Sequence, residues 1–266
     1  MSFNAIFVYP IVNVLVAIYK GLSLVGVPYA LGFSIIFITI FIKFILYPLV
    51  SSQVRATKKM QELAPHLKKN KEKYKKDAKR LQQETMKLYK EHGVNPVAGC
   101  LPVIIQIPLI WGLYSVFLLI LNLKPSGVVS EINKIVYFDY LKLSKPWNTD
   151  FFGVPLGGNP AGLINEIGFL IILVPFATGF FQFILSKMMM VKPKRDDGKK
   201  KDDFASMFQA QALYIFPIMI GFFSFTFPIG LSLYWNTFTI FGIIQQYKIA
   251  GLGGLKEYIN KINGSK

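Results

Sequence analysis

Five long apolar segments constrain this chain more than any other feature of its sequence. They cover approximately residues 29–50, 97–121, 163–188, 207–227 and 229–247. Each is close to the ~20 residues that an α-helix needs to cross the hydrocarbon core of a bilayer. The 266 residues are 53% hydrophobic, which is too apolar for a soluble domain of this size. We therefore predict an all-α polytopic membrane protein with five transmembrane helices, the last two joined by the Pro/Gly turn 227–230.

The N-terminal residues 1–28 do not fit a span as well. Their apolar stretch, Ala5 to Ile18, is short for one. Tyr9, Asn13 and Lys20 are suited to the headgroup region. We predict an N-terminal interfacial amphipathic helix, and a sixth span is the alternative.

The distribution of charge predicts the orientation. Lys and Arg outnumber Asp and Glu by 13 to 5 in residues 51–92, by 7 to 4 in 187–206 and by 4 to 1 in 248–266. The long segment 122–162 has only 4 against 3. Basic loops remain on the cytoplasmic side, so we predict the N-terminus outside and the C-terminus inside. Most of the net charge of +16 lies in these loops, which argues against DNA as a partner.

Residues 51–96 are polar but periodic, and we predict a cytoplasmic basic helical hairpin there. The second helix is expected to end at His92-Gly93. The alternative is a solvated linker. Two stripes at helical spacing support the hairpin, formed by Met60, Leu63 and Leu67 and by Leu81, Thr85 and Leu88. Its candidate contacts to anionic lipid, ribosomal RNA or an acidic partner include Arg55, Lys58, Lys59, Arg80 and Lys87. The remaining segments are predicted as an extracytoplasmic loop at 122–162, a cytoplasmic loop at 189–206 and a cytoplasmic tail at 248–266.

Lys43 lies inside the first apolar segment, with Thr39 and Tyr47 one helical turn on either side. A charge at the centre of a bilayer costs roughly 2.5–3.5 kcal/mol on insertion scales. The alternative is that Lys43 snorkels toward the nearer interface. No Asp or Glu lies mid-membrane to neutralise it, so we predict a solvent-accessible cavity around Lys43.

Other segments also carry polar faces, which are expected to turn inward from lipid. The alternative is that they are ordinary helix–helix contacts. The residues are Gln106 in the second segment, Thr178, Gln182 and Ser186 in the third, and Ser232, Asn236 and Thr239 in the last.

We find no catalytic set, no metal site and no cofactor motif. The single Cys100 excludes a disulfide framework and a cysteine-based metal site. His66 and His92 are far from any acidic cluster, and no phosphate-binding loop is present.

Several motifs, in order along residues 30–250, resemble the YidC/Oxa/Alb family of membrane protein insertases. The most specific are Gly93-Val94-Asn95-Pro96, Gly99-Cys100-Leu101-Pro102 and Gln106-Ile107-Pro108. Tyr47-Pro48-Leu49, Leu81-Gln82-Gln83-Glu84 and Phe227-Pro228-Ile229-Gly230-Leu231-Ser232-Leu233-Tyr234-Trp235 are also similar.

The resemblance implies a five-helix core with a hydrophilic groove that is open to the cytoplasm and to lipid. The family's basic groove residue, usually arginine, falls on Lys43, which keeps the charge without the planar fork. Its substrate-contact positions fall on Thr39, Ile110, Tyr234 and Trp235. The implied partners are nascent membrane proteins and membrane lipids, with the ribosome and the Sec translocon as candidates, in the bacterial cytoplasmic (inner) membrane. A secondary transporter or channel with an anion site at Lys43 is the alternative function, and an assembly chaperone is another.

Overall fold

The computed structural model describes residues 4–75, 77–93, 101–122, 125–189 and 204–256, together with Ile259 and Gly264. Contacts divide the chain into two compact units. The first contains residues 1–45, 103–182 and 217–241, and the second contains 46–102, 183–216 and 242–266. The predicted loop 189–206 and the motif region 94–100, with Cys100, lie largely or wholly outside the described residues.

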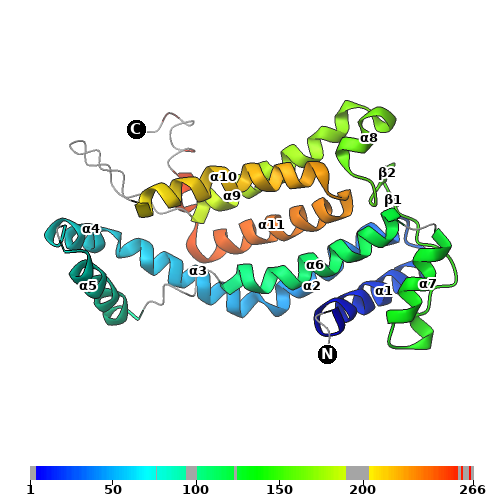
Figure 1. The fold of residues 1–266 in the computed structure, drawn as a ribbon, viewed down its shortest axis with the longest axis horizontal. Helices are drawn as coiled ribbons and strands as arrows, with labels where there is room; N and C mark the ends of the chain where they lie inside the picture. The colour runs from blue at the N-terminus through cyan, green and yellow to red at the C-terminus, as the bar shows by residue number, and fades with distance from the viewer. Residues whose placement is uncertain are drawn as a thin grey trace. The chain divides into compact units, whose positions relative to one another are not determined.

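Helices make up most of the described chain (Figure 1). The first unit contains the whole or a part of these helices: α1 (Tyr9–Leu24), α2 (Ala30–Ile45), α6 (Leu101–Asn122), α7 (Pro125–Ile135), α8 (Pro160–Ile167), α9 (Leu173–Met189), α10 (Phe204–Thr226) and α11 (Ile229–Ala250). In the second are α3 (Tyr47–Glu62), α4 (Ala64–Lys73) and α5 (Ala78–Glu91). The core of the first unit includes Leu15, Leu31, Ile35 and Phe117, all without exposed surface.

Two of the predicted spans have different bounds in the structure. The first is interrupted at Leu46, where α2 ends and α3 begins. Pro48 explains the break, because its ring clashes with the carbonyl four residues earlier and it donates no backbone hydrogen bond. The third does not begin at residue 163, because α8 ends at Ile167 and Gly168 takes a φ of +94° before a 3₁₀ turn leads into α9.

Length and composition identify fewer candidate spans than the sequence predicted. Within the described chain they are Asn4–Leu24 and Phe169–Met189, with α2 and α3 qualifying only when counted together. The N-terminal apolar stretch in the sequence, Ala5 to Ile18, is short for a span. In the structure the helical segment is longer, because a π-helical turn at Asn4–Val8 precedes α1, and Asn4–Leu24 is long enough to cross a membrane. The fold is therefore a mostly helical membrane protein, and the count of five spans stays a prediction.

The segment 122–162, predicted as a loop, contains regular structure. After α7 come a 3₁₀ turn at Asp139–Leu141 and a small antiparallel pair, β1 (Asp150–Phe151) and β2 (Val154–Pro155), so the chain is not purely α-helical. Phe151 packs directly on α2, where a Cβ at Gly32 would overlap its ring. Short elements separated by Gly and Pro have no long apolar period, which is why this packing was not predictable from the pattern of residues.

This segment is also held along α1 by hydrogen bonds from two polar side chains. Asn13 is buried; its Nδ2 donates to the carbonyl oxygen of Ile135 (3.0 Å) and its Oδ1 accepts from the backbone N–H of Tyr137 (2.7 Å). Two turns further on, Lys20 Nζ donates to the carbonyl oxygens of Tyr140 (2.5 Å) and Lys142 (3.0 Å). Asn13 and Lys20 thus bind protein backbone, whereas the sequence analysis assigned them to headgroups.

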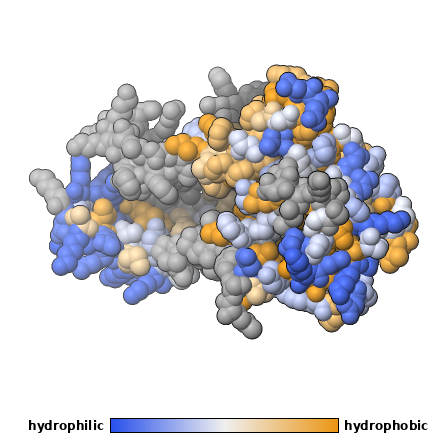
Figure 2. Space-filling view, turned by 45° about the vertical axis from the view of Figure 1, so that its right-hand side comes forward, coloured by the Kyte–Doolittle hydropathy of each residue, from blue (hydrophilic) through white to orange (hydrophobic). Residues whose placement is uncertain are grey.

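In the second unit, α4 and α5 pack against each other within the segment predicted as a helical hairpin. Asp77 caps α5 by accepting a hydrogen bond from the backbone N–H of Arg80 (2.9 Å). The helix ends where predicted, with Gly93 at a φ of +62° and its N–H bonded to the carbonyl of Lys90 (3.1 Å). Hydrophilic side chains cover this segment (Figure 2, left).

Candidate functional site

Lys43 is buried in the structure, with only 3% of its surface exposed. Its ammonium nitrogen lies 3.2 Å from the centroid of the Phe238 ring and 5.9 Å from that of Phe241, both on α11. No carboxylate pairs with it among the residues that the structure describes. The sequence predicts a solvent-accessible cavity around Lys43, but the side chain is buried against these two aromatic rings, which no spacing in the sequence indicates.

The burial of Lys43 follows from the sidedness of α2. Thr39, one turn before it, is 1% exposed and donates to the carbonyl of Ile35 (2.6 Å). On another face of the same helix, Phe37, Phe41 and Phe44 are 49%, 54% and 63% exposed. This arrangement, with polar groups inside and large apolar groups outside, suits a helix surrounded by lipid.

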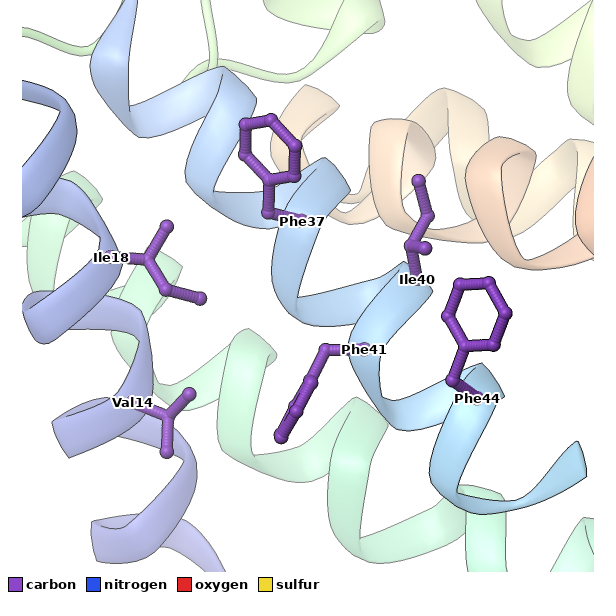
Figure 3. A pocket seen from close by; sticks show the side chains of 6 residues that line it. All are labelled: Val14, Ile18, Phe37, Ile40, Phe41 and Phe44. Atoms are coloured by element: carbon purple, nitrogen blue, oxygen red, sulfur yellow. The ribbon is translucent and has the colours of Figure 1, made fainter.

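The exposed face of α2 forms an apolar pocket with α1 (Figure 3). Val14 and Ile18 of α1 lie across from the side chains of α2, and the cavity measures about 480 Å³. The α2 residues that line it are Phe37, Ile40, Phe41 and Phe44.

α11 contributes three buried polar atoms that have no hydrogen-bond partner within the described ranges. They are the hydroxyl of Tyr234, which is fully buried, Oδ1 of Asn236 and Oε1 of Gln245. The ring of Tyr234 lies 5.9 Å from that of Phe238, so this hydroxyl-bearing side chain is next to the aromatic partner of Lys43. Trp235 is nearly buried and stacks on Phe227 at 6.3 Å between ring centroids.

Hydroxyl and amide groups join α9, α10 and α11. Ser224 of α10 donates to Thr178 of α9 (3.1 Å) and shares a hydrogen bond with Ser232 of α11 (2.8 Å). Thr239 donates to Gln182 at 3.3 Å. The alternative of helix–helix contact therefore describes these hydroxyls well, and Ser224 is a member that the sequence analysis missed because it stands alone among phenylalanines.

The remaining predicted site residues make contacts of their own or are not described. Tyr47 belongs to the second unit, where its carbonyl accepts from Gln245 Nε2 (3.2 Å), which also donates to Ser51 (3.1 Å). Ile110 is half-buried against the core of the first unit. The side chain of Gln106 lies outside the described part of the structure.

The five basic residues predicted as contacts of the hairpin, Arg55, Lys58, Lys59, Arg80 and Lys87, are all exposed. Among the described residues, no group of three or more His, Cys, Asp or Glu side chains could hold a metal ion.

Comparison with known proteins identifies the family. The family model described as "60Kd inner membrane protein" matches residues 23–252. The chain belongs to this family, the YidC/Oxa/Alb family. It is 34% identical over 95% of its length to "Inner membrane protein ALBINO3, chloroplastic" of Arabidopsis thaliana. It is also 34% identical over 87% of its length to "Membrane protein insertase YidC" of Rickettsia prowazekii, and 33% identical over 82% to that of Streptomyces avermitilis.

The family member described here spans about half or less of each of these relatives. It covers 53% of the Arabidopsis protein, 36% of the Rickettsia protein and 50% of the Streptomyces protein.

Proposed function

We propose that this chain is a membrane protein insertase that also assists the folding of its substrates. The observation that carries the proposal is the arrangement of α2, where a buried ammonium without a carboxylate partner in the described residues lies opposite a face of exposed phenylalanines. Such a helix offers a polar path on one side and a lipid contact on the other. Membership of a family that includes proteins named as insertases supports the same conclusion.

In this proposal, the short outer segment of an arriving polypeptide enters beside α2 and α11. Lys43 attracts acidic groups of that segment as a point charge. Tyr234 and Asn236 offer buried polar atoms that lack a partner in the described structure. The proposed substrate path comprises Thr39, Lys43, Tyr47, Gln106, Ile110, Gln182, Tyr234, Trp235 and Asn236.

Release of the substrate into lipid needs no energy source of the protein's own. Burial of apolar surface contributes about 25 cal/mol per Å². The membrane potential adds roughly 2.3 kcal/mol per charge per 100 mV for acidic segments that move outward. The exposed phenylalanines of α2 give the apolar part of the substrate a surface along which it enters the bilayer.

The proposed topology has five spans in the bacterial cytoplasmic membrane, with the N-terminus outside and the C-terminus inside. The π-helical turn at Asn4–Val8 and α1 are together long enough to span, but the contacts of α1 favour an interfacial position. The irregular backbone of residues 136–147 is bonded along it, and exposed irregular backbone does not occur in the hydrocarbon region. Asp139 in this stretch is fully exposed, and a hydrogen bond and the positive charge of Lys142 lower its pKa, which fits contact with water.

The α4–α5 segment is proposed to be the cytoplasmic contact surface. Its exposed basic groups suit anionic headgroups, worth about 1 kcal/mol per Lys or Arg near the surface. The same charges suit ribosomal RNA, and the Sec translocon is a further candidate partner.

Aqueous labelling of single cysteines tests the proposed path. Cysteines at positions 39, 43, 47 and 106, in a Cys100→Ser background, are exposed to a membrane-impermeant reagent from each side in turn. An insertase is expected to label from the cytoplasmic side only. Labelling from both sides would instead support a transporter or channel, and no labelling from either side would give Lys43 a snorkelling, structural role.

Reconstituted insertion tests the role of the charge. Lys43→Arg should preserve insertion, whereas Lys43→Glu should abolish it for substrates with acidic outer segments. Lys43→Ala with wild-type activity on every substrate would show that the charge is dispensable.

A further inference from the structure

We propose that Phe238 is a positioning residue that holds the Lys43 ammonium while no substrate is bound, and that an acidic group of a substrate competes with its ring. The second half of this inference rests on the proposed function, and the first half does not.

The geometry assigns the role to Phe238. The ammonium nitrogen lies 3.2 Å from the ring centroid, well inside the ~6 Å within which a cation is attracted by the negative face of an aromatic ring. Lys43 has only 3% of its surface exposed, so little water competes for the charge. Such contacts are strongest when they are desolvated.

Other aromatic residues pack around the ring of Phe238 and the ammonium of Lys43. Phe241 lies three residues further along α11 and presents a second ring 5.9 Å from the ammonium. Phe44, which follows Lys43 on α2, packs edge-on against Phe241 at 5.4 Å. On the other side, Tyr234 contacts Phe238 at 5.9 Å. One side of α11 thus places two aromatic rings next to the lysine nitrogen, with no carboxylate beside it among the described residues.

This arrangement has a consequence for substrate choice. A carboxylate that enters beside α2 forms a stronger, charge-assisted contact with an ammonium than a neutral ring does. An amide or hydroxyl gains less from displacing the ring. Displacing the ring of Phe238 from the ammonium is therefore more favourable for acidic outer segments than for neutral ones.

Ring fluorination of Phe238 tests the contact with little change of shape. Phenylalanines with one, two and three ring fluorines are introduced at position 238 of the full chain, which is purified in lipid nanodiscs. Fluorine withdraws charge from the ring face, so the melting temperature should fall by about 1–2 °C per fluorine. The same series with Lys43→Met, which keeps a long apolar stem without the charge, should show no trend. The proposed contact would be overturned if the melting temperature fell equally per fluorine with and without the Lys43→Met substitution. It would also be overturned if the melting temperature did not fall in the chain that retains Lys43.

Phe227 provides a matched control, because it is an aromatic residue that stacks on Phe223 and Trp235. Fluorination there should give the same result whether or not Lys43 is replaced by methionine. If the change in melting temperature per fluorine at Phe227 depended on Lys43, fluorination at any aromatic residue could produce the dependence, and it could not be assigned to the ring of Phe238.

Insertion of two matched substrates tests the competition. The substrates differ only in carrying Asp or Asn in the outer segment. Three fluorines at position 238 should raise the ratio of acidic to neutral insertion roughly twofold, since the weakened ring releases the ammonium more easily. An unchanged or lower ratio would overturn the competition. If neither substrate is inserted by the wild-type chain, the proposed function fails, while the melting series still decides whether Phe238 holds Lys43.

Discussion

α2 and α5 are helices of similar length that distribute polarity in opposite ways. α2 buries Ser34, Thr39 and Lys43, and it exposes large apolar side chains such as Phe41. α5 buries no residue fully, leaves its charged side chains largely exposed and half-buries its leucines. The same backbone geometry therefore serves two surroundings, with apolar side chains facing outward in one helix and polar ones in the other.

The comparison indicates that exposed side chains contact different surroundings in the two regions. An exposed phenylalanine on α2 fits contact with lipid tails, whereas an exposed lysine on α5 fits contact with water or headgroups. Equal substitutions at equally exposed positions should therefore have unequal effects, and this difference can be measured.

The largest effect is expected from placing a carboxylate on the exposed face of each helix. Phe41 is 54% exposed and Met86 is 42% exposed. Phe41→Asp should cost roughly 2.5–3.5 kcal/mol of stability in lipid, because the charge would enter hydrocarbon. Met86→Asp should change stability by less than about 0.5 kcal/mol. Equilibrium unfolding in mixed micelles compares the two.

Leucine at each position is the control for loss of side-chain volume. A loss below about 0.5 kcal/mol for Phe41→Asp would mean that this face of α2 contacts water, and the comparison would not hold.

A smaller effect is expected from adding one methyl group at a glycine in each region. Gly32→Ala should destabilise the protein by about 1–3 kcal/mol, because the new Cβ overlaps the ring of Phe151. Gly93→Ala meets open space but a φ of +62°, so about 1 kcal/mol is expected there from backbone strain alone. Thermal unfolding of both variants tests the order.

Phe151→Ala separates packing from backbone effects at Gly32. Once Phe151 is truncated, Gly32→Ala should add almost no further loss. A loss that persists in the double variant would show that the ring is not the cause.

Asp77→Ala should weaken α5 by about 1 kcal/mol, because the first turn loses the hydrogen bond from the N–H of Arg80. Hydrogen exchange at the amide of Arg80 should become faster, with α2 unaffected. Asp77→Asn retains the acceptor and should preserve most of the protection. Equal exchange in the Ala and Asn variants would argue against the cap.

The smallest effect is expected at Thr39. Its hydroxyl is bonded to the carbonyl of Ile35 in its own helix, so Thr39→Val should cost about 0.6 kcal/mol, typical of polar groups inside membrane proteins. The measurement is unfolding in the same micelles as for Phe41. A loss above about 2 kcal/mol would indicate a further partner of Thr39, such as bound water.

The sequence by itself determined the local structure and the polarity of each helix. Apolar length predicted most of the long helices, the Pro/Gly turn predicted the junction of α10 and α11, and Gly93 predicted the end of α5. The sequence also indicates that Lys43 turns away from lipid, because a charge is disfavoured on a face that contacts lipid. The side chain is 3% exposed, which does not match the solvent-accessible cavity predicted around it. These features depend on residues that are close together along the chain.

Tertiary structure decided which groups meet. No spacing in the sequence indicates that Lys43 lies over Phe238, that Phe151 packs on Gly32, or that Asn13 binds the backbone of residues 135–137. Each of these contacts joins residues more than a hundred positions apart along the chain, and many aromatic residues of this chain were equally possible partners. Helical periodicity fixes only the face on which a side chain lies, so the partner is chosen by the packing of one helix or segment against another.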